Sequence, residues 1–206
     1  MSCAKKGRCP ECVDGACVND VFPVFLKLCD RQAVVIGAGA MAAEKIPALL
    51  QAGAKVRVVS PRISPAVEAL SVECVQKEFE PQDLDEAWYV VAAAPPPVNR
   101  SVSRAAAERR LFVNAVDDVK SADLYLGSVI RRAGMTLSIS SNGRAPALTA
   151  LVRRGLERML PDELETWLEQ AEDLRPRWKA EGLPFAERRP ALLRVLNALY
   201  REELRP

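Results

Sequence analysis

A glycine-containing turn directly after an apolar run constrains the fold of this chain more than any other feature. The run covers residues 33–36 and leads into Gly37, Gly39 and Ala42, after which a helical pattern begins at Ala43. Strand, glycine turn and helix in this order form the context in which a G-x-G-x-x-G/A motif indicates dinucleotide binding. Gly37 permits the tight turn, Gly39 lets backbone approach a pyrophosphate, and Ala42 allows the helix to pack closely on the strand. The free N–H groups at the helix start then favour phosphate.

Length and composition describe an ordinary globular protein. The chain has 206 residues, of which 49% are hydrophobic and 27% charged, which is enough to build a real core. It contains no apolar run of ~18 residues, and its first ten residues have no apolar signal core, so we expect a cytoplasmic protein without a membrane partner. Histidine is absent. Acid–base chemistry or metal ligation must therefore use carboxylates, thiols, lysine, tyrosine or backbone groups.

Four of the six cysteines lie close together in the leader, residues 1–20. They are Cys3, Cys9, Cys12 and Cys17, and the middle two form a C-x-x-C pair. In a cytoplasmic protein such cysteines argue for thiols or a metal site before disulfides, and four thiolates can hold zinc or an iron–sulfur cluster. Zinc sites usually have two close pairs farther apart than these. A metal-binding leader and a flexible, reduced tail both stay open.

Apolar strands alternate with helices over the next hundred residues. The predicted strands are residues 33–36, 56–59, 73–77, 88–93 and 111–116, and the predicted helices are residues 44–52, 65–70 and 98–110. This alternation predicts an α/β, Rossmann-like parallel sheet covered by helices on both faces. The apolar residues 22–28 are interpreted as a first edge strand.

Ligands of such sheets sit beyond the carboxyl ends of the strands. We therefore expect the glycine turn and the ends of the fourth and fifth strands, residues 92–95 and 114–118, to face one crevice. The small Ala92, Ala93 and Ala94 would leave room there for a cofactor, although core packing explains small residues equally well.

The second strand ends in Ser60, Pro61 and Arg62 instead of the acidic residue that would bind the ribose of NAD. Arg62 is suited to a 2′-phosphate or to stacking on adenine, so the residues leave the choice between NAD and NADP open.

Asp117 is the candidate for acid–base work, because it ends a strand at the crevice and Asp118 beside it would raise its pKa. Capping of a turn is the structural alternative for Asp117.

A second section begins near Ser121. We predict strands at residues 124–130 and 135–140, a helix over residues 147–160 opened by Pro146, a helix capped by Asp162, and a last helix over residues 191–204. The middle helix has apolar residues at the spacing of core residues, namely Leu164, Trp167, Leu168, Ala171, Leu174 and Trp178. Pro176 is expected to end or kink this helix.

Arginines are abundant from residue 104 to residue 154, which suits a polyanionic substrate. The aromatic share of 5% and the absence of a recognition motif argue against nucleic acid.

Several separate motifs together resemble the precorrin-2 dehydrogenase/sirohydrochlorin ferrochelatase module of siroheme synthases. The matching pieces are residues 22–26 (Phe-Pro-Val-Phe-Leu), 35–42 (Val-Ile-Gly-Ala-Gly-Ala-Met-Ala) with Lys45, 52–54 (Ala-Gly-Ala), 56–61 (Val-Arg-Val-Val-Ser-Pro), 98–99 (Val-Asn), 114–117 (Asn-Ala-Val-Asp) with Lys120, and 140–146 (Ser-Ser-Asn-Gly-Arg-Ala-Pro). They occur in order from about residue 21 onward. The sequence departs from the family at Glu44, often arginine, and at residues 94–96, which often begin with Thr-Asp.

The resemblance implies a Rossmann NAD-binding domain at residues 21–120, a dimerisation section at 121–146 and a helical domain at 147–206, joined as a homodimer. It implies oxidation of precorrin-2 to sirohydrochlorin with NAD⁺, and in some members Fe²⁺ insertion. The family's aspartate falls on Asp117. Implied cofactor contacts are Gly39, Ala40, Met41, Pro61 and Arg62, and the glycine turn and the fourth strand end add Gly37, Ala93 and Ala94. The predicted contacts to the carboxylate-rich tetrapyrrole are Asn114, Lys120, Ser141 and Arg144. The methyltransferase domain fused to some members is not expected at this length.

A function of another class stays open beside the enzyme. The chain would then be a sensor or carrier that binds NAD(H) or a tetrapyrrole without turnover, with the leader cysteines responding to metal or redox state. The glycine turn together with Asp117 favours the enzyme.

Overall fold

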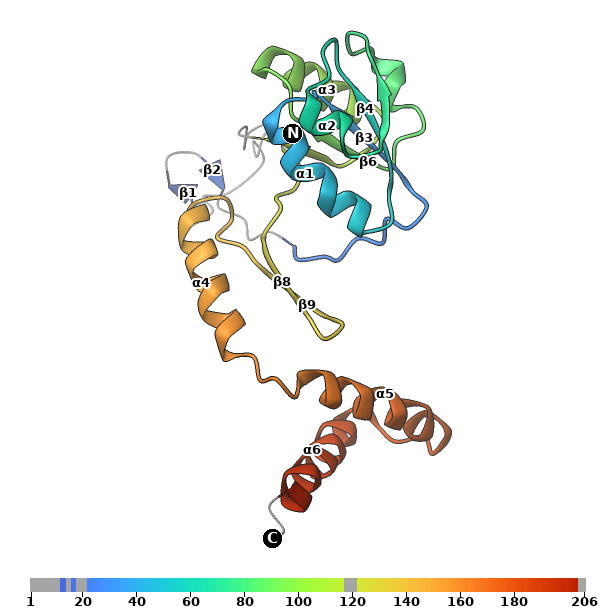
Figure 1. Cartoon of the computed structure of the whole chain (residues 1–206), viewed down its shortest axis with the longest axis vertical. Coiled ribbons are helices and arrows are strands. Elements are labelled where there is room, and N and C mark those ends of the chain that lie inside the picture. The colour runs from blue at the N-terminus through green and yellow to red at the C-terminus, as the bar shows by residue number, and fades with distance from the viewer. Residues whose placement is uncertain (1–11, 14–15, 18–21, 117–121, 204–206) are drawn as a thin grey trace. The chain divides into compact units, whose positions relative to one another are not determined.

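The computed structural model describes residues 12–13, 16–17, 22–116 and 122–203 (Figure 1). Contacts divide the chain into two compact units, residues 1–126 and residues 127–206. In the first unit a short antiparallel pair, β1 (Cys12–Val13) and β2 (Ala16–Cys17), precedes the main sheet. None of the helices in the described ranges is both long and apolar enough to cross a membrane.

A parallel five-stranded sheet forms the centre of the first unit. Its strands are β3 (Gln32–Ile36), β4 (Lys55–Val59), β5 (Glu73–Val75), β6 (Tyr89–Ala92) and β7 (Val113–Ala115), in the order β5-β4-β3-β6-β7. Ala33 pairs with Val56 on one side and with Tyr89 on the other, so β3 is the central strand. The predicted Rossmann-like sheet is confirmed.

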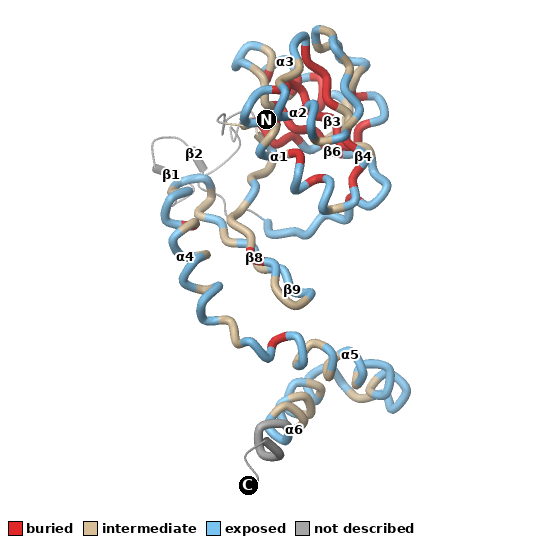
Figure 2. Tube along the Cα trace, viewed as in Figure 1, coloured by how far each residue is buried: buried red, intermediate tan, exposed pale blue. Residues whose placement is uncertain are grey.

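Helices cover both faces of this sheet, because alternate residues of each strand point in opposite directions. Ala33 and Val35 pack in one buried cluster with α1 (Ala40–Gln51) and α2 (Pro65–Glu68). Val34 and Ile36 pack in a second cluster with α3 (Pro96–Glu108) and the 3₁₀ helix η1 (Pro81–Leu84). The buried residues accordingly concentrate along the strands of this unit in Figure 2.

Two predictions for this unit are wrong. Residues 22–28 form no strand; they run as irregular chain, and Phe22 is 86% exposed and Phe25 71%. Since β4 and β6 flank β3 on both sides, the segment cannot pair with the strand that it leads into, and β5 and β7 are the edge strands of the described sheet. Helix α1 begins at Ala40, earlier than predicted, and accommodates Pro47 in its interior.

The second unit contains a hairpin followed by three helices. Strands β8 (Ser128–Arg132) and β9 (Met135–Ile139) are antiparallel, and the turn residues Ala133 and Gly134 have φ of 49° and 72°. The helices are α4 (Pro146–Met159), α5 (Leu164–Ala180) and α6 (Phe185–Glu203). A hydrogen bond of 3.1 Å between the hydroxyls of Ser128 and Thr149 joins β8 to α4.

Several details of this unit differ from the prediction. Residues 124–127 precede the hairpin without joining a strand, and Asp162 does not cap α5 but accepts a hydrogen bond from Arg132. Pro176 lies inside α5 without ending it, and α6 begins six residues before the predicted residue 191. Of the apolar residues predicted as core in α5, Leu164 is buried, while Trp167, Leu168, Ala171, Leu174 and Trp178 are half-buried.

Candidate cofactor-binding site

A crevice of ≈ 560 Å³ opens at the carboxyl ends of β3, β4 and β6. Six predicted cofactor residues line it: Gly37, Gly39, Pro61, Arg62, Ala93 and Ala94. The chain runs outward from β3 to β5 on one side and through β6 to β7 on the other, so the strand order reverses between β3 and β6. Ligands of open α/β sheets bind at such a reversal. The fold thus places the glycine turn where a dinucleotide is expected.

The turn after β3 is packed against the end of β6. Gly37 has φ of +102°, and a Cβ at this position would lie 2.4 Å from the carbonyl oxygen of Ala93. Its N–H donates to the carbonyl of Val59 at 2.9 Å, while the N–H of Ala93 donates to that of Ile36 at 2.8 Å. Glycine is therefore required at position 37 both for the backbone angle and for the close approach.

Helix α1 begins at the floor of this crevice without a side-chain cap. Gly39 is its N-cap residue, no side chain bonds to the cap, and a Cβ on Gly39 would have no described heavy atom within 4 Å. The first turn contains Ala40 and Met41, which are not among the lining residues of the crevice, and no side chain caps its backbone N–H groups. Such an uncapped, positively polarised helix start fits a phosphate group. The residues present therefore fit the pyrophosphate of a dinucleotide.

The loop after β4 is held by polar contacts that leave the guanidinium of Arg62 free. The hydroxyl of Ser60 donates to the carbonyl of Arg62 at 2.9 Å, and the side-chain amide of Gln76 donates to that of Pro61 at 3.2 Å. Among the described residues, the side chain of Arg62 has no hydrogen-bond or ion-pair partner. A second cavity of ≈ 410 Å³ adjoins this loop and is lined by Arg62, Ile63, Glu68, Cys74 and Gln76.

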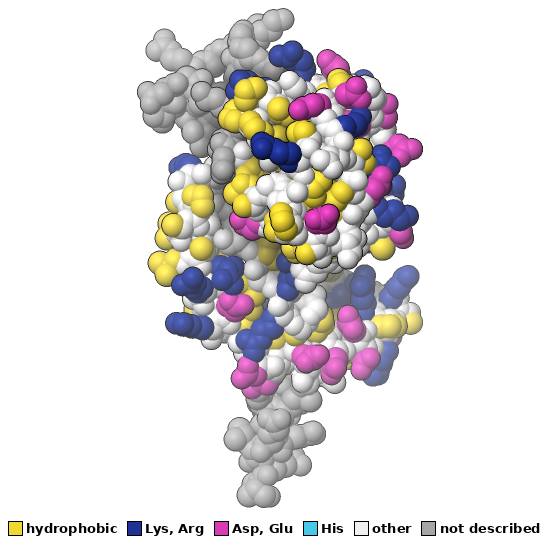
Figure 3. Space-filling view, turned by 45° about the horizontal axis from the view of Figure 1, so that its top comes forward, with side chains coloured by type: hydrophobic (Ala, Val, Ile, Leu, Met, Phe, Trp, Pro, Cys, Tyr) yellow, Lys and Arg dark blue, Asp and Glu magenta, His cyan; other side chains and the backbone are white. Residues whose placement is uncertain are grey.

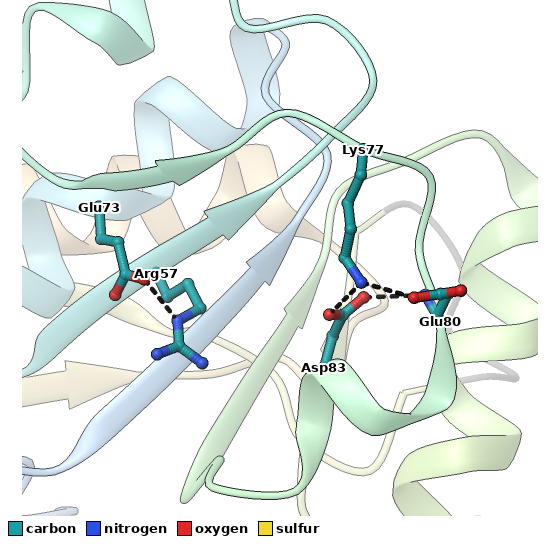
Figure 4. A network of polar contacts seen from close by, with 5 residues as sticks. All are labelled: Arg57, Glu73, Lys77, Glu80 and Asp83. Atoms are coloured by element: carbon teal, nitrogen blue, oxygen red, sulfur yellow. Dashed lines mark hydrogen bonds and ion pairs between the residues drawn. The ribbon is translucent and has the colours of Figure 1, made fainter.

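The loop after β5 contributes Glu78 and Phe79 to the crevice wall. An ion-pair network connects the residue before this pair to residues after it. The Lys77 ammonium lies 2.7 Å from a carboxylate oxygen of Glu80 and 2.8 Å from one of Asp83 (Figure 4). Hydrogen bonds to Asp83 and then to Glu80 raise the pKa of Lys77. The network fixes the loop that carries Phe79 to the crevice.

Asn99 is a positioning residue that the sequence did not single out as part of the site. It is 3% exposed in α3, and its side-chain oxygen accepts a hydrogen bond of 3.0 Å from the N–H of Ala94. Ala94 lines the crevice, so Asn99 fixes the backbone of the wall opposite Gly37. The signal in the sequence was a polar side chain at an otherwise buried position of a predicted helix.

Those predicted substrate residues that the structure describes are not among the lining residues of the crevice. Asn114 is buried in β7, one strand beyond the crevice wall; its side-chain nitrogen donates to the carbonyl of Leu124 at 3.2 Å, and its oxygen has no partner among the described residues. Ser141 and Arg144 belong to the second unit, where the Ser141 hydroxyl accepts a hydrogen bond of 2.9 Å from the N–H of Ala145. Asp117 and Lys120 fall outside the described residues.

The predicted metal site in the leader is not tested. The backbone of Cys12 pairs with that of Cys17 in the register of β1 and β2, whereas Cys3 and Cys9 lie outside the described residues. Within the described part of the chain, no group of three or more cysteine or acidic side chains could hold a metal ion.

Comparison with known families identifies the kind of domain that contains the glycine turn. A family model described as putative NAD(P)-binding matches residues 24–128, which is half of the chain and includes the whole parallel sheet. The chain belongs to this NAD(P)-binding family. A second model, described as sirohaem biosynthesis protein central, matches residues 132–159 of the second unit.

Individual proteins that are similar to this chain are siroheme synthases. Siroheme synthase 3 of Aeromonas hydrophila subsp. hydrophila is 38% identical over 184 residues, covering 87% of this chain and 39% of the relative. Siroheme synthase of Zymomonas mobilis subsp. mobilis is 33% identical over 186 residues, covering 88% of this chain and 40% of the relative. The chain therefore spans about two fifths of the length of these relatives. The resemblance to siroheme synthases predicted from the motifs is confirmed.

A solved structure confirms the fold. SirC, precorrin-2 dehydrogenase, has a TM-score of 0.68 and 21% sequence identity, and the match covers 89% of this chain and 94% of SirC. The NAD(P)-binding sheet followed by C-terminal helices is thus the fold of both chains.

Proposed function

We propose that this chain is an NAD-dependent dehydrogenase that oxidises precorrin-2 to sirohydrochlorin in siroheme or cobalamin biosynthesis. The observation that carries the proposal is the crevice at the strand-order reversal, in a chain that siroheme synthases match over 87% of its length. The name of the structural relative, precorrin-2 dehydrogenase, supports the same reaction.

The residues of the crevice have separate roles in this proposal. The first turn of α1, with Gly39, Ala40 and Met41, binds the pyrophosphate, and Pro61 and Arg62 bind the adenosine end. Ala93 and Ala94 leave space for the nicotinamide because their side chains are small. When NAD⁺ is bound, it supplies the acceptor for a hydride from a ring carbon of the tetrapyrrole.

Oxidation also releases a proton, which we assign to Asp117. A carboxylate is a competent acceptor, and the chain has no histidine that could take this role. The carboxylates of the tetrapyrrole are proposed to meet Asn114, Lys120, Ser141 and Arg144. The two cationic side chains pair with carboxylates and the Ser141 hydroxyl donates a hydrogen bond, while Asn114, whose side-chain nitrogen donates to the carbonyl of Leu124, supports the segment that follows β7.

The decisive experiment follows NADH absorbance when the purified chain is mixed with precorrin-2 and NAD⁺. We expect NADH to form with the native protein and its rate to fall at least about a hundredfold in Asp117→Asn, the lower end for loss of general acid–base catalysis. Asp123→Asn is the matched control, because its carboxylate bonds the N–H of Val113 at 3.2 Å and does not line the crevice. Binding of NADH without any turnover would instead establish the sensor or carrier function.

Insertion of Fe²⁺ into sirohydrochlorin is a separate step that the same preparation can test. Sirohydrochlorin and Fe²⁺, or Co²⁺ as a stable substitute, are added without NAD⁺, and the tetrapyrrole spectrum is followed. A spectral change that depends on protein would add chelation to the function. Unchanged spectra would limit the chain to dehydrogenation.

We further propose that the chain forms a homodimer through its second unit. Helix α4 leaves apolar side chains uncovered, with Leu148 55% exposed, Leu151 65% and Val152 41%. Apolar side chains also lie uncovered on the face shown in Figure 3. Several exposed apolar residues on one helix are typical of a protein–protein interface.

A further inference from the structure

Two helices begin at the crevice, and their first turns differ in what they offer a ligand. Helix α1 begins after Gly39 without a side-chain cap, and α3 begins after Pro95, at the wall that also contains Ala94 and Val98. The first N–H groups of a helix have no partner within it and carry the positive partial charge of its start. A second anion-binding helix start would therefore be expected at α3.

The start of α3 has no N–H group to offer. Its cap residue and its first two residues are Pro95, Pro96 and Pro97, and proline lacks an N–H. The N–H of Val98 donates to the carbonyl of Pro95 at 2.9 Å, and that of Asn99 donates to the same oxygen at 3.0 Å. Every position that usually leaves a free donor is therefore either without an N–H or already bonded.

The strand end that precedes α3 is equally without free donors. The N–H of Ala93 donates to the carbonyl of Ile36 at 2.8 Å, and that of Ala94 donates to the side-chain oxygen of Asn99 at 3.0 Å. The carbonyl oxygens of Ala93 and Ala94 accept no hydrogen bond from the residues that the structure describes. Residues 93–98 thus form a wall with apolar surface and hydrogen-bond acceptors but no donor, and we call it the acceptor wall.

Polar side chains do not compensate on this side of the crevice. Those among its lining residues are Ser60, Arg62, Ser64 and Glu78, and all four follow β4 or β5. A carboxylate placed at the acceptor wall would lose water and gain no donor, which is costly for a charge. An amide in the same place is neutral, and its nitrogen can donate to the free carbonyl oxygens. The acceptor wall therefore distinguishes an amide from a carboxylate.

We infer that the acceptor wall selects the carboxamide form of the cofactor and rejects its deamidated form, nicotinic acid adenine dinucleotide. The inference rests on the proposed binding of NAD, with the nicotinamide beside Ala93 and Ala94, and adds a specificity to that site. The two dinucleotides differ in one substituent of the pyridine ring, which is a neutral amide in NAD⁺ and an anionic carboxylate in the deamidated form. Discrimination against this carboxylate comes from backbone groups and from the run of prolines that removes N–H groups.

Calorimetric titration of the full chain with NAD⁺ and with its deamidated form tests the acceptor wall without requiring turnover. We expect the deamidated form to bind at least about tenfold more weakly than NAD⁺. A smaller difference would overturn the inference and leave the proposed dehydrogenase function intact. If NAD⁺ itself did not bind, the proposed function would fail instead.

A variant with restored N–H groups separates the acceptor wall from the rest of the site. The double substitution Pro96→Ala/Pro97→Ala gives the first turn of α3 two N–H groups. We expect it to bind the deamidated form about threefold more tightly or better, and NAD⁺ within about twofold of the native Kd. An unchanged Kd for the deamidated form in a folded double variant would overturn the inference.

Pro146→Ala is the matched control for this variant. It makes the same change at the first residue of α4, which belongs to the second unit, and should change neither Kd. Thermal unfolding of all three proteins shows whether the variants are folded. The comparison of the two dinucleotides on the native chain decides the inference even where the double variant is unstable.

Discussion

Gly37 and Ala93 approach so closely that no side chain fits between the two loops. A Cβ on Gly37 would lie 2.4 Å from the carbonyl oxygen and 2.7 Å from the carbonyl carbon of Ala93. Both atoms are backbone, so they cannot move aside as a flexible side chain would. The contact joins the two strands between which the sheet reverses its order, and it sets the width of the crevice at that point.

Gly37→Ala should therefore damage both the fold and the site. A left-handed backbone costs a residue with a Cβ about 1–2 kcal/mol, and overpacking adds about 1–3 kcal/mol. We expect the free energy of unfolding to fall by about 2–5 kcal/mol and NADH binding to be lost. Urea unfolding and NADH titration measure the two effects. A variant of native stability would contradict the contact.

Gly39→Ala separates cofactor binding from folding. Gly39 has φ of −88°, and a Cβ there would meet no described atom within 4 Å, so alanine is compatible with the backbone. The methyl group would instead occupy the open space above the first turn of α1. NADH should bind about tenfold more weakly or worse, while the melting temperature stays close to the native value. Unchanged NADH affinity would place the pyrophosphate elsewhere.

Asn99→Leu tests the wall formed by Ala94. The change removes the acceptor of the Ala94 N–H, whose loss should cost about 1–3 kcal/mol of stability. Because the freed loop lines the crevice, the Kd for NADH should rise about three- to tenfold. Val102→Ala, a buried change on the same helix, serves as a control that lowers stability and keeps the acceptor of the Ala94 N–H. An equal rise in Kd in this control would show that general loosening, not the hydrogen bond, causes the effect.

The central sheet was predictable from the sequence because its strands are local and strongly apolar. Val34 and Val35, for example, are both buried, on opposite faces, which is typical of a strand covered by helices on both sides. The segment that begins with Phe22 is just as apolar but forms no strand. Whether an apolar segment pairs depends on whether its path leads along a free sheet edge, and residue patterns do not contain that information.

The start of α1 was predicted too late for a physical reason connected with function. Helix starts are recognised from Ser, Thr, Asp or Asn caps, and Gly39 offers no such side chain. The missing cap leaves the N–H groups available for phosphate, so the weak folding signal coincides with the binding site. Asn99 was noticed only as part of a family motif, because its role depends on a contact with the backbone of Ala94, five residues earlier in the chain.

Lys77→Met should loosen the loop that presents Phe79. The change removes the ion pairs of 2.7 Å and 2.8 Å to Glu80 and Asp83, and the Kd for NADH should rise about threefold, since exposed ion pairs contribute little. The raised pKa of Lys77 determines how its contribution to the stability of the protein depends on pH. Its contribution to stability is fully present below 10.5, the usual lysine pKa, and is lost as pH rises through the raised value.

The difference in melting temperature between native protein and Lys77→Met should therefore stay constant from neutral pH to about pH 10 and shrink above it. Lys77→Arg is the matched control, because arginine does not titrate in this range and should keep its stabilisation there. A difference that changed between pH 6 and pH 8 would contradict the network as the cause.

Leu151→Arg should separate the proposed dimer into monomers. Leu151 is 65% exposed on α4, so the substitution leaves the fold of one chain intact. In a dimer, each copy would bury a leucine that contributes about 1.5–3 kcal/mol, and two such losses raise the dimer Kd at least about a hundredfold. Light scattering coupled to size exclusion should show a dimer for the native chain and for the control Arg154→Ala, and a monomer for Leu151→Arg at the same concentration. A native chain that elutes as a monomer at every concentration would rule out the α4 interface. NADH titration of the monomeric variant then shows whether the NAD(P)-binding unit holds its cofactor alone, which we expect because the described residues of the crevice all come from the first unit.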